Sequence, residues 1–140
     1  MKKETLLNEE ISFFALELSL LLRTGISTGD ALLLLSDEAG GSMKELLSSM
    51  ASAADSGLPL SRIMEETGRF PSYVTGLTAV GEASGRLEES LAALARYYDA
   101  RDRLDRQIRS ALLYPALILF LMTVVIFVLL IRVLPVFQDV

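Results

Sequence analysis

The sequence predicts an all-α protein: a six-helix antiparallel bundle whose last helix continues into one transmembrane helix. Leu and Ala, which favour helices, dominate the 140 residues, and Val is rare outside the C-terminal segment. Apolar side chains recur at the three-to-four-residue spacing of a helix face over much of the chain. The segment 111–131 contains no charged residue, and this length suits a bilayer-spanning helix.

Composition excludes several classes of function. The chain has no Cys and no His, so disulfides, thiolate or imidazole metal sites and His-dependent catalysis are absent. Residues 1–95 carry 7 basic and 14 acidic side chains, a balance that disfavours nucleic-acid binding. We therefore expect that the protein is not an enzyme and has no catalytic residues. We also expect no cofactor, no bound metal and no nucleic-acid partner.

The first element predicted is a helix from Ile11 to Arg23. Residues 1–10 are expected to form a flexible N-terminus rather than a signal peptide, because acidic residues follow the two N-terminal lysines at once. Gly25 lies just past the helix end, where a left-handed cap suits glycine. The helix is predicted from one apolar face, formed by Ile11, Phe14, Ala15, Leu18, Leu21 and Leu22.

Three shorter helices should follow. Ser27 with Asp30 resembles a capping box at the start of the second helix. The turns at residues 24–28 and 56–60 are similar in sequence, which indicates either two helix hairpins built alike or the general likeness of Gly-rich turns. The predicted helices are Asp30–Ala39, Met43–Asp55 and Leu60–Glu66.

A fifth helix should begin with Pro71 in its first turn and end near Glu82. Gly81 and Gly85 should be structural, allowing close packing and a turn with positive φ. For Glu82 two interpretations compete: contact with a partner or a cation, or a carboxylate that caps the N-terminus of the next helix. We favour the cap.

The sixth helix is predicted to be long. An apolar seam begins at Leu87 and continues through Leu91, Leu94, Tyr98, Leu104 and Ile108. Three Asp–Arg pairs at i,i+4 within residues 99–109 support the same helix.

The predicted membrane segment follows directly. Four arginines between residues 101 and 109 precede it and only Arg132 follows, so the N-terminal domain should be cytoplasmic. Tyr114 suits the membrane interface, Pro115 should kink the helix, and Pro135 should end it. The predicted organisation is a helical domain over 11–110, a transmembrane helix over 111–134 and an extracytoplasmic tail over 135–140.

Several motifs resemble those of one family. They are Phe70-Pro71, the Gly-Glu-x-Ser-Gly-x-Leu run of 81–87, the Ala-Leu-x-Tyr-Pro run of 111–115, the Val-x-Pro-x-Phe run of 133–137, and residues 22–32 around Gly25. Together they resemble the F-domain platform proteins of type II secretion systems, type IV pili and competence pili. The resemblance covers the first domain and first transmembrane helix of that family, whose members usually carry two such domains and three spans. The family-motif residues with structural roles are Gly25, Phe70, Pro71, Gly81, Glu82, Gly85, Leu87, Tyr114, Pro115 and Pro135.

The resemblance implies a non-enzymatic assembly platform in the inner membrane that couples a cytoplasmic ATPase to the assembly of pilin-like subunits. Implied partners are the secretion or pilus ATPase, pilin or pseudopilin subunits, other inner-membrane platform proteins, further copies of the chain and membrane lipid. Candidate partner contacts are Glu65, Glu66 and Glu82, of which Glu65 and Glu66 are the exposed carboxylates expected to meet the ATPase. The alternative function is a membrane-anchored helical scaffold or signalling module that binds a cytoplasmic regulator.

Overall fold

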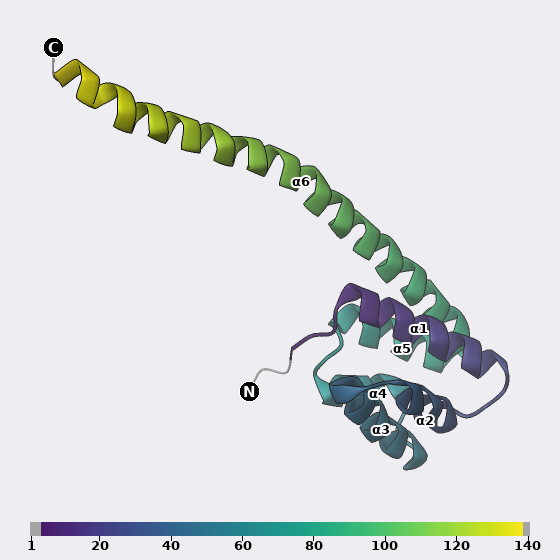
Figure 1. Ribbon diagram of the computed structural model, residues 1–140. Helices are drawn as coiled ribbons and strands as arrows, with labels where there is room; N and C mark the ends of the chain where they lie inside the picture. The colour runs from purple at the N-terminus through teal and green to yellow at the C-terminus, as the bar shows by residue number, and fades with distance from the viewer. Residues whose placement is uncertain (1–3, 139–140) are drawn as a thin grey trace. The chain divides into compact units, whose positions relative to one another are not determined.

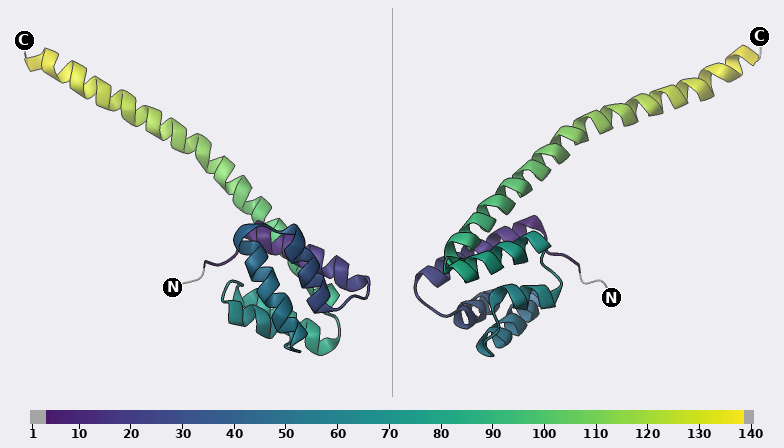
Figure 2. Two further views of the ribbon diagram at one scale, coloured as in Figure 1. Left: turned by 60° about the horizontal axis from the view of Figure 1, so that its bottom comes forward. Right: turned by 180° about the vertical axis from the view of Figure 1, so that it is seen from behind.

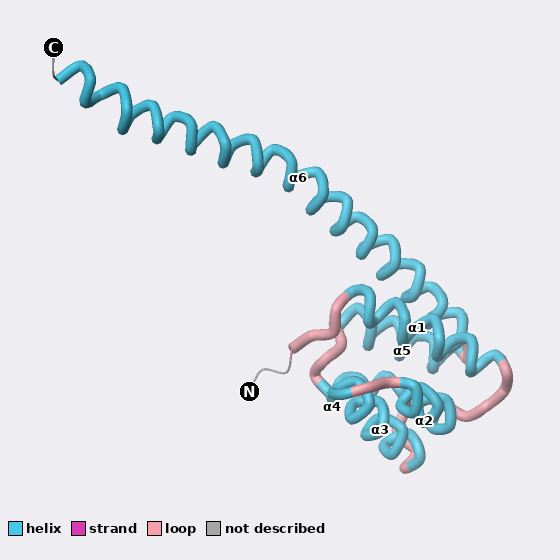
Figure 3. Tube along the Cα trace, in the orientation of Figure 1, coloured by secondary structure: helices cyan, strands magenta, loops and turns pink. Residues whose placement is uncertain are grey.

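The computed structural model describes residues 4–138, and every regular element in that range is an α-helix (Figure 3). This confirms the predicted all-α class. The chain divides into two compact units, of which the first ends at Asp102 and the second begins at Arg103. The helices are α1 (Asn8–Arg23), α2 (Thr28–Glu38), α3 (Gly41–Asp55), α4 (Leu60–Thr67), α5 (Ser72–Ser84) and α6 (Leu87–Gln138).

The first unit is a helical domain built around one apolar core. Helices α1 and α5 lie together with the first turns of α6, while α2, α3 and α4 form a second group (Figures 1 and 2). Every helix contributes to the core, whose buried side chains include Leu18, Leu32, Met50, Met64, Val74 and Leu91, one from each helix in order. The core therefore brings α1, at the start of the domain, together with the first turns of α6, at its end.

Residues 4–10 of the N-terminal segment make contacts that the sequence did not predict. Helix α1 begins at Asn8, three residues before the expected start, because the backbone N–H of Leu7 donates to the Glu10 carboxylate at 2.8 Å. Leu6, in the segment expected to be flexible, is buried, and its N–H donates to the carbonyl of Arg69 at 2.9 Å. The Nε of Arg69 in turn donates to the carbonyl of Glu4. Residues 1–3 lie outside the described range.

The two turns that are alike in sequence are also alike in conformation. Gly25 and Gly57 adopt φ values of +91° and +92°, and each closes the helix before it by a bond to the carbonyl three residues back. Only glycine adopts such values without strain. The predicted cap at Ser27 is also present, because its hydroxyl accepts from the N–H of Asp30, although α2 begins two residues earlier than expected.

The second unit consists of the helical residues from Arg103 to Gln138, all of which are exposed. This part of α6 supplies the one helix in the described chain that is long and apolar enough to cross a membrane, and none of its most apolar 18-residue window is buried. The hydroxyl of Thr123 donates to the carbonyl of Leu119 at 2.8 Å. The hydroxyl of Thr123, a polar group within the apolar stretch, is thus hydrogen-bonded within the helix itself.

Two expectations for α6 were wrong. Pro135 does not end the helix, which runs to Gln138. A proline removes a single N–H donor, and the residues after it still donate to the carbonyls four positions before them, so a helix that is otherwise favourable can continue through it. Leu104 and Ile108 do not extend the buried seam, because they lie beyond the domain and are more than half exposed. The kink at Pro115 and the membrane boundary at residue 111 stay predictions.

Candidate functional site

Two glycines constrain the junction of α5 and α6. Gly81 is buried, and a Cβ there would lie 2.7 Å from the Cβ of Ser90 and 3.2 Å from the Cα of Leu87. Gly85 ends α5 with φ of +71°. The N–H of Arg86 donates to the carbonyl of Gly81 at 2.8 Å, and the N–H of Gly85 to that of Glu82, which together form a Schellman cap. Both glycines are therefore required by the sharp turn and the close helix contact.

Glu82 caps a helix, but not the helix that the sequence indicated. Its two carboxylate oxygens accept from the backbone N–H groups of Leu60 and Ser61, each at 2.8 Å. These are the first two residues of α4, so the carboxylate satisfies two unpaired donors and interacts favourably with the helix dipole. The predicted target was the start of α6. Pro59, which precedes α4, has no side chain that could cap, and Glu82 supplies the missing acceptor from 22 residues away.

The Phe70-Pro71 motif fixes the entry to α5. Phe70 is buried, with its ring centroid 5.4 Å from that of Phe14 on α1. Pro71 occupies the N-cap position rather than the first helical turn, one residue from the prediction. The motif therefore ties α5 to α1 through an aromatic contact.

At the start of α6, Leu87 is partly buried and packs against the core. Tyr98, about three helical turns further along α6, is almost wholly buried. Burial raises the pKa of the Tyr98 phenol, and the nearby Arg101 partly opposes this shift.

The candidate partner contacts all lie on or against α4. Glu65 and Glu66 are exposed near its C-terminal end, and Glu66 pairs with Arg62 at 3.5 Å. Glu82 contacts the opposite end of the same helix. The structure therefore does not bring the three carboxylates together at one point. Among residues 4–138, no group of His, Cys, Asp and Glu is placed to hold a metal ion.

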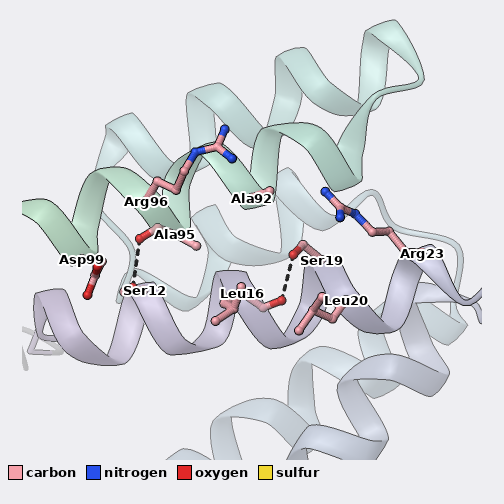
Figure 4. A pocket seen from close by; sticks show the side chains of 9 residues that line it. All are labelled: Ser12, Leu16, Ser19, Leu20, Arg23, Ala92, Ala95, Arg96 and Asp99. Atoms are coloured by element: carbon pink, nitrogen blue, oxygen red, sulfur yellow. Dashed lines mark hydrogen bonds between the residues drawn. The ribbon is translucent and has the colours of Figure 1, made fainter.

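A shallow groove between α1 and the first turns of α6 was not predicted (Figure 4). Its volume is about 360 Å³, and it is bordered by Leu16, Leu20, Arg23 and Arg96. The hydroxyl of Ser12 donates to the carbonyl of Ala95 at 2.9 Å, which holds the two helices together at one side of the groove. Sequence gave no sign of this contact because its members are 83 residues apart.

The remaining motif residues lie in the second unit. Tyr114, Pro115 and Pro135 are exposed on α6, where Tyr114 precedes the most apolar stretch. Together the two units define a class of protein: a small helical domain that leads into one apolar helix fit to span a membrane.

The chain belongs to the family described as type II secretion system (T2SS), protein F, which matches residues 14–135. It is 28% identical over 133 residues to the type IV pilus assembly protein TapC of Aeromonas hydrophila, covering 94% of this chain and 32% of that protein. It is 31% identical over 126 residues to the protein transport protein HofC homolog of Escherichia coli K12, covering 89% of this chain and 32% of that protein.

The type II secretion system protein F of Pseudomonas aeruginosa is 29% identical over 124 residues, covering 88% of this chain and 31% of that protein. The chain thus spans about a third of the length of these curated relatives. The family is part of secretion and pilus machinery, so the resemblance seen in the sequence motifs is confirmed.

Proposed function

We propose that the chain is a non-enzymatic component of an assembly platform in the inner membrane, in a type II secretion or type IV pilus machine. The observation that carries this proposal is the family match over residues 14–135, which includes both the helical domain and the apolar helix. In this role the domain meets a cytoplasmic ATPase, and the membrane helix transmits the resulting displacement to pilin-like subunits.

The arginines before the apolar stretch support a cytoplasmic domain. Arg101, Arg103, Arg106 and Arg109 all precede it, whereas Arg132 is the one basic residue at its far end. Positive residues near a span are retained on the cytoplasmic side, and they also attract anionic lipid headgroups. The domain then lies in the cytoplasm, where ATP is available to an ATPase.

Helix α4 is the surface we propose for the ATPase. Glu65 and Glu66 are exposed on it, in a domain whose first 95 residues carry twice as many acidic as basic side chains. Glu82 acts as a positioning residue, because its carboxylate fixes the first turn of the same helix. A contact of this kind speeds encounter with a basic surface and weakens with salt. It should also be weak, because a moving coupling must release its partner.

The apolar helix is the part proposed to meet other membrane components. Its exposed side chains in the second unit offer an extended apolar surface to lipid, to pilin or pseudopilin subunits, to other platform proteins and to further copies of the chain.

The direct test is capture of the native hexameric ATPase by the full chain in lipid nanodiscs, at low and high salt. We expect capture near 50 mM salt that falls several-fold near 500 mM, since screening shortens the reach of surface charges from roughly 14 Å to about 4 Å. The variant Glu65→Lys/Glu66→Lys should reduce capture. The matched variant Glu88→Lys/Glu89→Lys changes an adjacent glutamate pair on α6 by the same charge and should not.

Circular dichroism should first establish that both variants keep the helicity of the parent chain. Failure to capture the ATPase at any salt, with the chain folded and the ATPase hexameric, would count against direct coupling through this domain. Equal losses in the two variants would mean that net charge, and not α4, decides the interaction.

A further inference from the structure

A second groove, separate from α4, lies between the N-terminal half of α1 and the junction of α2 with α3. Its volume is about 390 Å³, within the size range of small-molecule binding clefts. Phe14, Leu35 and Leu47 are buried and form its floor. Phe13 on α1, which is 62% exposed, and Met43 on α3 border it. Phe13 thus leaves a large aromatic surface in water beside an apolar hollow.

The rim of this groove is acidic. Glu9 and Glu10 border it from the first turn of α1, and Glu38 borders it from the last residue of α2. The carboxylate of Glu10 is held in place by the N–H of Leu7 at 2.8 Å. No Lys or Arg is among the described residues that line the groove. The same hollow therefore offers an apolar floor and a concentrated negative rim.

We propose that this groove docks an amphipathic helix of a protein partner, with large apolar side chains that enter the hollow and Lys or Arg side chains that meet the three glutamates. The charge of the rim selects a basic partner. A helix is favoured over an extended peptide, because the described residues form no strand edge with which an extended peptide could pair. An anionic membrane surface is disfavoured by the same carboxylates.

This surface does not depend on the ATPase contact proposed for α4. It lies on α1, α2 and α3, whereas Glu65 and Glu66 lie on α4. Binding at one surface can therefore be lost while the other persists.

The test uses the full chain in nanodiscs of zwitterionic phosphatidylcholine and a fluorescent helical peptide of leucines at i, i+3, i+4 and i+7 with lysines elsewhere. A second peptide carries glutamate in place of every lysine. Fluorescence anisotropy should detect binding of the lysine peptide that weakens with salt, and the glutamate peptide should bind at least about tenfold more weakly, a difference of about 1.4 kcal/mol.

Two matched pairs of variants locate the site. Glu38→Lys should weaken the lysine peptide several-fold, whereas Glu45→Lys, at an exposed glutamate on α3 that does not line the groove, should leave affinity within about twofold. Phe13→Ala should weaken binding in the same way. Leu33→Ala removes a comparable exposed side chain outside the groove and should have no effect.

The inference is overturned if the matched variants behave alike, because binding would then follow total charge or total apolar surface. It is also overturned if Phe13→Ala has no effect while Glu38→Lys does, since no side chain would then enter the hollow. Binding of the chain's domain to anionic vesicles that depends on Glu38 and Phe13 would assign the groove to a membrane instead. Unchanged helicity in every variant keeps these outcomes distinct from unfolding.

Discussion

Glu82, near the C-terminal end of α5, joins that helix to the start of α4, and among the described residues its side chain is the acceptor for the first two N–H groups of α4. Replacement by alanine should cost about 1–2 kcal/mol of unfolding free energy, because both donors lose a charged acceptor. Glu82→Gln should lose less, since the amide still accepts one bond.

Thermal or urea unfolding of the domain measures both changes. The control is Glu89→Ala, whose carboxylate is 69% exposed and 3.9 Å from Arg86, and whose loss should cost no more than about 0.5 kcal/mol. Equal effects of Glu82→Ala and Glu89→Ala would mean that water replaces the cap at little cost.

Gly81 and Gly76 both lie inside α5 but face different surroundings. Gly81→Ala should destabilise the domain by about 1–3 kcal/mol, because the new methyl group meets Ser90 and Leu87. Gly76→Ala meets nothing within 4 Å and should stabilise the helix by about 0.5–1 kcal/mol.

Opposite signs for one chemical change in one helix would establish close packing, and not helix propensity, as the role of Gly81. A stabilising Gly81→Ala would show that α5 and α6 can separate at little cost. The measurement is again the unfolding free energy, with helicity as the check on structure.

At this scale the sequence predicts contacts between neighbouring residues better than contacts between residues far apart in the chain. The cap at Ser27 was predictable because its partner lies three residues away. The cap made by Glu82 was not, because no local pattern connects it with Leu60 across a 22-residue separation. Pairings of this kind depend on how α4 and α5 pack.

Helix α1 is an element with two apolar sides. Leu18 is fully buried in the core, whereas Leu16 on the same helix is 45% exposed. Leu18→Asp should lower the unfolding free energy by about 3 kcal/mol or more, because it places an unpaired charge in the core. Leu16→Asp should change it by no more than about 0.5 kcal/mol.

Thermal melts of fragment 1–105 compare the two variants with the parent. Similar melting temperatures for Leu18→Asp and the parent would contradict the assignment of this face to the core. A strong loss for Leu16→Asp would indicate that the outer side of α1 is covered in the folded fragment.

The presence of each helix was predictable from the spacing of apolar residues, but several of the residues at which helices begin or end were not. The start of α1 depends on the Glu10 cap, and the end of α6 depends on whether a helix continues past Pro135. Local sequence preference sets the free-energy cost of ending a helix at a given residue. Contacts with the rest of the structure can offset that cost, and so move the helix end.

For the whole molecule, the central prediction is topology. Reporter fusions at residue 5 and residue 140 should show a cytoplasmic N-terminus and a C-terminus on the other side of the membrane, because four arginines precede the apolar stretch and one follows it.

Replacing Arg101, Arg103, Arg106 and Arg109 by glutamine should weaken this bias and yield a mixed orientation. Cytoplasmic signals from both fusion sites would contradict a single crossing of the membrane. The membrane segment itself was predictable from composition, whereas the grooves of the domain were not, since each is lined by residues from separate helices.

The bond from Ser12 to the carbonyl of Ala95 has a consequence for the order of events during synthesis. Helix α1 leaves the ribosome first, but the residues that cover its apolar side arrive 83 positions later. The hairpin of α2 and α3 involves only residues that are close in sequence and can form early. Short loops close at the lowest cost in chain entropy. Closure of the core must wait for Leu94 and Tyr98, and the uncharged stretch begins at Ala111, 13 residues after Tyr98. The domain therefore completes its folding at the moment when translation delivers the segment destined for the bilayer.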